Sequence, residues 1–209
     1  MKGLYRQAFL SFIFFVACFY ARAYATMPGP IWPTPNDAFF KVQPLDTFIQ
    51  PTASGQVLSG TFGCVRNNGR RFHEGIDIKA IRRNKRNEPL DDIRAVFPGT
   101  VAYINRKAGN SAYGCYVVLE HEEEGLRFYT LYAHLASINN GLAIGQMVCQ
   151  GAILGIMGHT GGGGIPKTRA HLHFEIGIPI GTQEVFEQWY RLQKYTVRNF
   201  HGGWNGLNL

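Results

Sequence analysis

Cysteine is scarce in this sequence of 209 residues: there are four, and no two of them have Cys-x-x-Cys spacing. The absence of this spacing argues against a cysteine zinc knuckle and against a dithiol redox motif. Charged residues are also few, at 17%, whereas hydrophobic residues reach 45%. A chain of this composition can bury the core of one ordinary domain, so disorder is not expected.

Long helical periods are scarce as well. The 25 glycines separate short apolar runs, which favours strands and turns. The strands are expected at 95–104, 115–121, 127–135, 147–158 and 171–177, with a hairpin loop at "HEEEGLR". We therefore predict an all-β or β-rich domain built on antiparallel sheet. One short C-terminal helix is expected over 185–195, where Val185, Trp189 and Leu192 have helical spacing.

The first 25 residues have the layout of a secretory signal peptide. Lys2 and Arg6 precede 13 apolar residues, and the small residues of "ARAYA" suit cleavage after Ala23 or Ala25. The apolar run is short for a membrane-spanning helix, so no stable membrane span is expected after cleavage. Two alternatives are an N-terminal membrane anchor and lipidation at Cys18.

The rest of the chain divides by composition. We predict a signal peptide at 1–25, a proline-rich linker or arm at 26–56, one folded domain at 57–180 and a C-terminal extension at 181–209. The arm is expected to lie on the domain, and it could also cover a site and keep it latent. The charged segment 82–92 has no hydrophobic period and is expected to be a solvated loop.

The net charge is too small and too dispersed for a nucleic-acid partner. It falls from +7 to +4 when the signal peptide is removed. A mildly basic surface would favour an anionic partner such as a cell-wall polymer or a membrane surface.

Cleavage of the signal peptide would also leave an odd number of cysteines, whose pairing the sequence does not fix. The "GGGG" loop at 161–164 lacks the Lys-Ser/Thr ending of a phosphate loop, which argues against nucleotide binding.

The segment "HLHFEI" alternates between polar and apolar residues. As a strand it places His171, His173 and Glu175 on one face, with Leu172, Phe174 and Ile176 on the other. The α-carbons of neighbouring polar residues on that face are about 6.5 to 7 Å apart, so two imidazoles can converge on one ion. The alternative is a half-exposed strand that carries two surface histidines.

A second segment, "RFHEGIDIKA", supplies His73 and Asp77, and Gly75 lies between them. Gly75 and the isoleucines at 76 and 78 favour extended chain, so this is not the helical HExxH motif. A histidine and an aspartate on one face suit a divalent metal ion. Gly75 is expected to leave room beside the strand for a substrate or an ion.

A third segment, "FYTLYAHLAS", also alternates. As a regular strand it would place Thr130, Tyr132 and His134 on one polar face, with the apolar residues on the other. Three strands that each offer histidine are more informative than a lone histidine, which is usually structural.

In this order, the motifs "FHEGIDI", "LYAHLA" and "GHTGGGG…HLHFEIG" resemble the lysostaphin/LytM-type zinc metallopeptidases, which cut peptidoglycan peptides. The similarity spans roughly residues 57 to 180 and implies their duplicated hybrid motif fold. It implies that His73, Asp77 and His173 bind one zinc ion, and that His134 and His171 are catalytic. Spacing alone does not distinguish His171 from His173 as the ligand.

Three protein ligands leave one coordination position open, the layout of a catalytic zinc site. Zinc can lower the pKa of water in that position to about 7. His134 or His171 would take the proton, and the other would stabilise the oxyanion or protonate the leaving amine. Which histidine does which is open.

The chain departs from this family at two points. Some members have an oxyanion-stabilising tyrosine in the loop before the first motif, but "GCVRNNGRR" between Phe62 and His73 has none. Arg70 or Arg71 is the hypothesised substitute. His159 stands where asparagine is common and is expected in a loop beside the groove, whereas the histidines at 121 and 201 are expected at the surface.

The resemblance implies an exported zinc metalloendopeptidase that cuts peptidoglycan cross-links or stem peptides, in the periplasm or at the cell surface. The alternative is a non-catalytic relative that binds the wall or activates other hydrolases. A plain carbohydrate-binding β-domain would explain the sheet and the aromatic residues but not the ordered histidines.

Overall fold

The computed structural model describes residues 27–66, 68–69, 71–161, 163–179, 188, 191–192 and 206–208. The predicted signal peptide lies outside these residues, as does most of the predicted helix 185–195. Of that segment, Gln188, Arg191 and Leu192 are described, and they are helical. Within the described ranges, no helix is long and apolar enough to cross a membrane.

Strands dominate the described residues, and helices are a turn or so long. The strands are β1 Val65–Arg66, β2 Arg71–Phe72, β3 Ile76–Lys79, β4 Asp92–Arg94, β5 Gly99–Asn105, β6 Tyr116–Glu123, β7 Leu126–Ala133, β8 Leu135–Ile138, β9 Met147–Val148, β10 Ile153–Met157, β11 His171–Pro179 and β12 Gly206–Asn208. The helical turns are α2 Leu45–Phe48, η1 Val57–Gly60, η2 Ala108–Asn110 and η3 Lys167–Arg169. The predicted β-rich, antiparallel fold class is confirmed.

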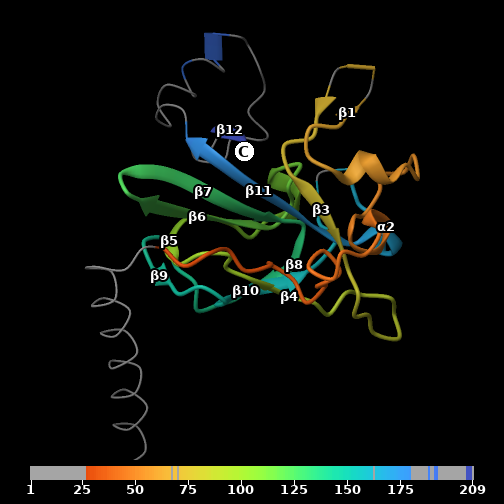
Figure 1. Ribbon diagram of the computed structural model, residues 1–209, viewed down its shortest axis with the longest axis horizontal. Coiled ribbons are helices and arrows are strands. Elements are labelled where there is room, and N and C mark those ends of the chain that lie inside the picture. The colour runs from red at the N-terminus through yellow and green to blue at the C-terminus, as the bar shows by residue number, and fades with distance from the viewer. Residues whose placement is uncertain are drawn as a thin grey trace, which may run out of the picture.

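The largest sheet has the strand order β12-β11-β7-β6-β5-β9, with β3 paired to β11. All of its pairings are antiparallel. Glu124 and Gly125 link β6 to β7 with φ of 50° and 82°. Positive φ at both central residues matches the twist of a two-residue hairpin, as expected for "HEEEGLR". In Figure 1, β11 is the long blue strand that crosses the molecule next to β7.

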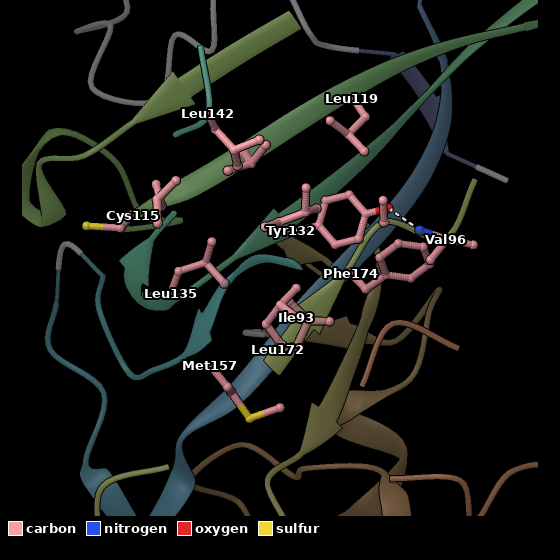
Figure 2. Close-up of a cluster of buried hydrophobic side chains, with 14 of the residues drawn as sticks. Ile93, Val96, Cys115, Leu119, Tyr132, Leu135, Leu142, Met157, Leu172 and Phe174 are labelled. Atoms are coloured by element: carbon pink, nitrogen blue, oxygen red, sulfur yellow. Dashed lines mark hydrogen bonds between the residues drawn. The ribbon is translucent and has the colours of Figure 1, made fainter. Parts of the chain in front are cut away.

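The second layer is a three-stranded sheet, β4-β10-β8, which lies below the large sheet in Figure 1. The main core fills the space between the two sheets (Figure 2). The large sheet contributes Leu119, Tyr132, Leu172 and Phe174, and the small sheet contributes Ile93, Leu135 and Met157. A second cluster, formed by Tyr116, Val118, Tyr129, Leu131 and Ala133, packs on the opposite face of the large sheet.

The main core contains a short chain of polar groups. The Tyr132 hydroxyl accepts the Val96 N–H at 2.9 Å (Figure 2) and lies 3.0 Å from Thr130 Oγ1. That threonine oxygen is 2.8 Å from Nε2 of His121, whose Nδ1–H donates to the Pro98 carbonyl. Only 3% of His121 is exposed, so its expected surface position is wrong. The imidazole fits inside because each of its nitrogens has a partner.

The proline-rich arm runs along the edge of both layers. Ile49 forms a bridge with Ile78 on the outer edge of β3, and Gln50 N–H donates to the Asp77 carbonyl. Trp32 packs against the main core and stacks on Phe39 with 5.0 Å between ring centroids. The arm therefore completes the fold on the β3 side.

Candidate metal centre

Strands β3 and β11 bring two of the predicted site residues together. Asp77 lies directly opposite His173 in the antiparallel register, and Ala133 of β7 lies opposite His173 on the other side. Because alternate residues share a face, Asp77 and His173 point away from the main core. The apolar partners Ile78 and Leu172 point into that core and are fully buried. The site therefore lies on the face of the large sheet that is opposite to the main core.

His73 reaches the same place from the segment between β2 and β3. Its N–H donates to the Cys64 carbonyl, which continues the β1–β2 hairpin by one step. Gly75 then lets the chain pass β11 closely, since a Cβ there would lie 2.2 Å from the Phe174 carbonyl oxygen. This corrects the expected role of Gly75: the missing side chain makes room for β11 and not for a substrate.

Three ligand atoms converge in this arrangement. His73 Nε2 lies 3.0 Å from Asp77 Oδ1 and 3.1 Å from His173 Nδ1, and the latter two atoms are 3.0 Å apart. All three residues are buried, and these atoms lie within 4.8 Å of one another. They are the three residues that the resemblance implies as zinc ligands.

Each histidine of the cluster has its second nitrogen engaged. His73 Nδ1–H donates to the Thr61 carbonyl at 2.8 Å, which leaves Nε2 free for a metal ion. His173 Nε2–H donates to Glu175 Oε1 at 2.8 Å, which leaves Nδ1 free. Glu175 in turn accepts the hydroxyl of Tyr113. Such partners fix the tautomer and ring orientation of a metal-binding histidine.

The charges of the cluster are strongly coupled. Burial alone would raise the pKa of the Asp77 carboxyl, but His171, His173 and His73 outweigh it and hold this pKa well below its usual value. Burial lowers the pKa of His173, but the hydrogen bonds to Asp77 and Glu175 outweigh it and raise this pKa to about 10. Metal binding at Nδ1 of His173 would therefore release a proton.

His134 lies beside the cluster, but by a route that the strand pattern did not predict. Strand β7 ends at Ala133, and His134 is left-handed, with φ of 63°. Thr130 and Tyr132 share one face as predicted, but that face is buried against the main core and His134 does not lie on it, so the predicted polar face of all three residues is wrong. Continued alternation would have sent the His134 side chain toward that core. The left-handed residue turns it to the metal side instead, with its ring centroid 5.9 Å from that of His173.

Two imidazoles flank the cluster. His134 Nδ1–H donates to the Thr160 carbonyl at 2.7 Å, and His171 Nδ1–H donates to the Arg169 carbonyl at 2.6 Å. Their ring centroids are 4.8 Å apart, and His171 Nε2 lies 3.5 Å from Asp77 Oδ1. Burial, together with His171 and His173, lowers the pKa of His134 well below its usual value.

An arginine reaches the site from the hairpin before His73. The guanidinium of Arg66 lies 3.3 Å from the outer oxygen of Asp77, Oδ2, and also donates to the Ser59 carbonyl. Arg70 and the side chain of Arg71 lie outside the described part of the chain. Sequence reasoning missed Arg66 because it stands in a short hairpin whose pairing the sequence did not indicate.

His159 stands apart from the cluster. Its Nδ1–H donates to the Ile165 carbonyl, and its Nε2 lies 3.2 Å from Glu88, which also pairs with Lys167. These contacts tie the 82–92 segment to the glycine-rich loop. That segment is more ordered than a solvated loop, because Asp91 is fully buried and accepts the N–H groups of residues 81 and 82.

Fold and site together define a two-layer β-sheet protein with a cluster of two histidines and one aspartate that could hold a metal ion. The family model described as Peptidase family M23 matches residues 71–185, which is more than half of the chain. The chain therefore belongs to peptidase family M23, as the sequence motifs predicted.

Solved structures of similar proteins include the catalytic domain of the prophage-encoded M23 protein EnpA from Enterococcus faecalis, at 20% identity and a TM-score of 0.45, covering 72% of this chain and 86% of that one. The catalytic domain of lysostaphin from Staphylococcus simulans is 24% identical, with a TM-score of 0.41 and coverage of 59% and 78%. A zinc-containing peptidase from Vibrio cholerae is 26% identical, with a TM-score of 0.41 and coverage of 55% and 30%. Comparison with curated proteins returns no match.

Proposed function

We propose that the chain is an exported zinc endopeptidase that hydrolyses peptide bonds of bacterial peptidoglycan, either in cross-links or in stem peptides. The observation that carries the proposal is the convergence of His73, Asp77 and His173 within 4.8 Å, beside two further imidazoles. Membership of peptidase family M23 supports the reaction class. The substrate class comes from the resemblance of the motifs to lysostaphin/LytM-type peptidases.

The chemistry of the donor set supports zinc. Two imidazole nitrogens and one carboxylate oxygen form a typical protein ligand set for catalytic zinc, and each imidazole already has a second partner. When bound, zinc would supply a Lewis acid and, from water, a nucleophile at neutral pH. His73 would bind through Nε2, His173 through Nδ1, and Asp77 through a carboxylate oxygen.

The two flanking histidines would move the protons. The Nδ1–H of each is held by a backbone carbonyl, so Nε2 is the available atom on both rings. Because burial lowers the pKa of His134, its neutral form can accept a proton at Nε2 as water attacks the peptide carbonyl. In its protonated form, His171 would donate its Nε2–H to the oxygen of that carbonyl as negative charge develops on it. No serine or cysteine nucleophile is needed.

The proposal extends to the rest of the chain. Residues 1–25 would direct export and be removed, 57–180 would form the peptidase domain, and the enzyme would act in the periplasm or at the cell surface. Residues 26–56 would be the arm and 181–209 a C-terminal extension. The arm's position along β3 supports a stabilising role in that division.

Digestion of purified peptidoglycan by the zinc-loaded chain that begins at Thr26 tests the proposal, with the products identified by mass spectrometry. New peptide ends are expected from the wild type and from the control His159→Ala, but not from His173→Ala. The mass of the products would also name the bond. An absence of products from several wall types, with one zinc per chain measured, would contradict the proposal in favour of a non-catalytic wall-binding regulator.

A further inference from the structure

One tyrosine contacts both halves of the site. Tyr113 stands in the connection between η2 and β6, and its backbone carbonyl accepts the N–H of His134 at 2.9 Å. Its hydroxyl donates to Oε1 of Glu175, the same oxygen that accepts the Nε2–H of His173. The Tyr113 ring lies against the His173 ring, with 5.3 Å between centroids. Tyr113 therefore contacts a candidate metal ligand through its side chain and a candidate catalytic histidine through its backbone.

The Glu175 carboxylate lies between Tyr113 and His173, and burying a charged group of this kind is costly in free energy. Only 3% of Glu175 is exposed, and only 4% of His173. A buried carboxylate needs hydrogen bonds to stay ionised, and the Tyr113 hydroxyl and the His173 N–H provide them.

The loop that carries Tyr113 is itself fixed. Asn105 donates to the Gly114 carbonyl at 2.5 Å, and Ser111 Oγ accepts the Tyr113 N–H at 3.1 Å. Gly114 has φ of 68°, and a Cβ there would lie 2.4 Å from Thr160. Thr160 is also the residue whose carbonyl holds His134. The loop that carries Tyr113 therefore packs closely on the residue that holds His134.

We propose that Tyr113 is a positioning residue of the metal centre, which acts through Glu175 to aim Nδ1 of His173 at the metal ion. Without the hydroxyl, Glu175 loses the donor that holds Oε1 beside His173 and can turn away from the imidazole. The imidazole is then free to rotate or to take the other tautomer, and both changes remove Nδ1 from the ligand set. This inference rests on the ligand set of the proposed function but not on its substrate.

Zinc affinity of the metal-free full chain tests the inference, by competition with a chromophoric chelator. Outer partners of metal-binding histidines typically change affinity by about 10- to 100-fold, and we expect a loss in that range for Tyr113→Phe. The matched control is Tyr132→Phe, which removes a buried hydroxyl on the opposite face of the sheet. It should lower the melting temperature of the metal-free protein and leave zinc affinity unchanged.

Two variants of the intervening carboxylate keep the test decisive if Tyr113→Phe fails to fold. Glu175→Gln retains an acceptor for His173 and should lose less affinity than Glu175→Ala. Equal zinc affinity of Tyr113→Phe and the wild type, or equal losses for Glu175→Gln and Glu175→Ala, would overturn the inference. Because the experiment measures zinc affinity, it tests the role of Tyr113 independently of peptidoglycan cleavage.

Discussion

The left-handed backbone of His134 decides which side of the sheet its imidazole reaches, and a substitution can separate this backbone effect from the chemistry. Asparagine tolerates the left-handed region, whereas alanine pays about 1 kcal/mol for it. We expect His134→Asn and His134→Ala both to lower peptide hydrolysis by about 10²- to 10⁴-fold, because each removes the proposed base. Thermal melting should show that only His134→Ala is also less stable. Retained hydrolysis in either variant would remove His134 from the mechanism.

The second prediction at the scale of single residues concerns Arg66. Its guanidinium faces the outer oxygen of Asp77, and that side chain is 25% exposed. We expect Arg66→Gln to weaken zinc binding about tenfold, since the carboxylate loses the partner that orients it. Arg127→Gln is the control, because Arg127 pairs with Glu120 away from the site and its side chain is 61% exposed. Titration of the metal-free variants with zinc distinguishes the two, and an unchanged affinity of Arg66→Gln would make its contact with Asp77 incidental.

The sequence predicted the residues of this site better than it predicted their setting. His73, Asp77 and His173 could be named because strand alternation gathers the candidate residues, and the resemblance to the family then selects His173 over its neighbour at 171. Tyr113 and Arg66 could not, because each meets the site through a loop or short hairpin whose path depends on tertiary packing. Glu175 was visible in the alternation of "HLHFEI", but its role depends on a partner 62 residues away.

At the scale of elements, the alternation of polar and apolar residues predicted the buried face correctly wherever the strand is regular. Alternation placed Leu172 and Phe174 in the core, as β11 shows. It failed in "FYTLYAHLAS", since both faces of β7 are buried and neither is polar throughout. Between two packed layers, periodicity no longer tells which face carries a site. The left-handed break at His134 gives no signal in a single sequence.

The arm is the element with a testable structural role. Trp32 packs on the main core and meets the rings of Phe39 and Phe48, with centroid distances of 5.0 and 6.1 Å. We expect Trp32→Ala to cost about 3 kcal/mol in the free energy of unfolding, the low end of the range for aromatic rings in a core, because Trp32 is only partly buried. Phe40→Ala, at a ring whose residue is 61% exposed, should cost less than about 1 kcal/mol. Urea unfolding of the zinc-loaded proteins measures both.

The same pair of variants tests whether the arm keeps the enzyme latent. The arm contacts β3 and the main core, so loosening it at Trp32 should not raise peptidoglycan hydrolysis. A gain of activity in Trp32→Ala, without a gain in Phe40→Ala, would make the arm an inhibitor.

At the scale of the whole molecule, the two faces of the large sheet have different roles. One face packs against the β4-β10-β8 layer, and the other carries the metal cluster beside the smaller cluster of Tyr116, Val118, Tyr129, Leu131 and Ala133. Because β3 and β11 hydrogen-bond in one sheet, the ladder itself holds Asp77 and His173, whereas His73 is held by its contacts with the Cys64 and Thr61 carbonyls. A site on rigid strands is positioned more accurately than one on loops.

The main core also gives the folded protein a pH dependence that is separate from the metal site. Burial lowers the pKa of His121 below its usual 6.5, and this effect outweighs the opposing influence of the Pro98 carbonyl and Glu120. Near pH 6.5 the unfolded chain therefore takes up a proton at this residue before the folded chain does. Stability is lost as pH falls from about 7 through 6.5 toward the lowered value, with a slope of up to about 1.4 kcal/mol per pH unit. Above about pH 7.5 both states are neutral and the contribution is flat.

The difference between two stability curves isolates this residue from the other histidines. We expect zinc-loaded wild type and His121→Gln to unfold with a constant difference in free energy above pH 7.5. As pH falls from 7 to 5, the wild type should lose stability faster, since glutamine has no proton to gain. Urea unfolding at each pH measures the curves, and parallel curves for His121→Gln and wild type would mean that the buried imidazole is not the acid-sensitive group of the core.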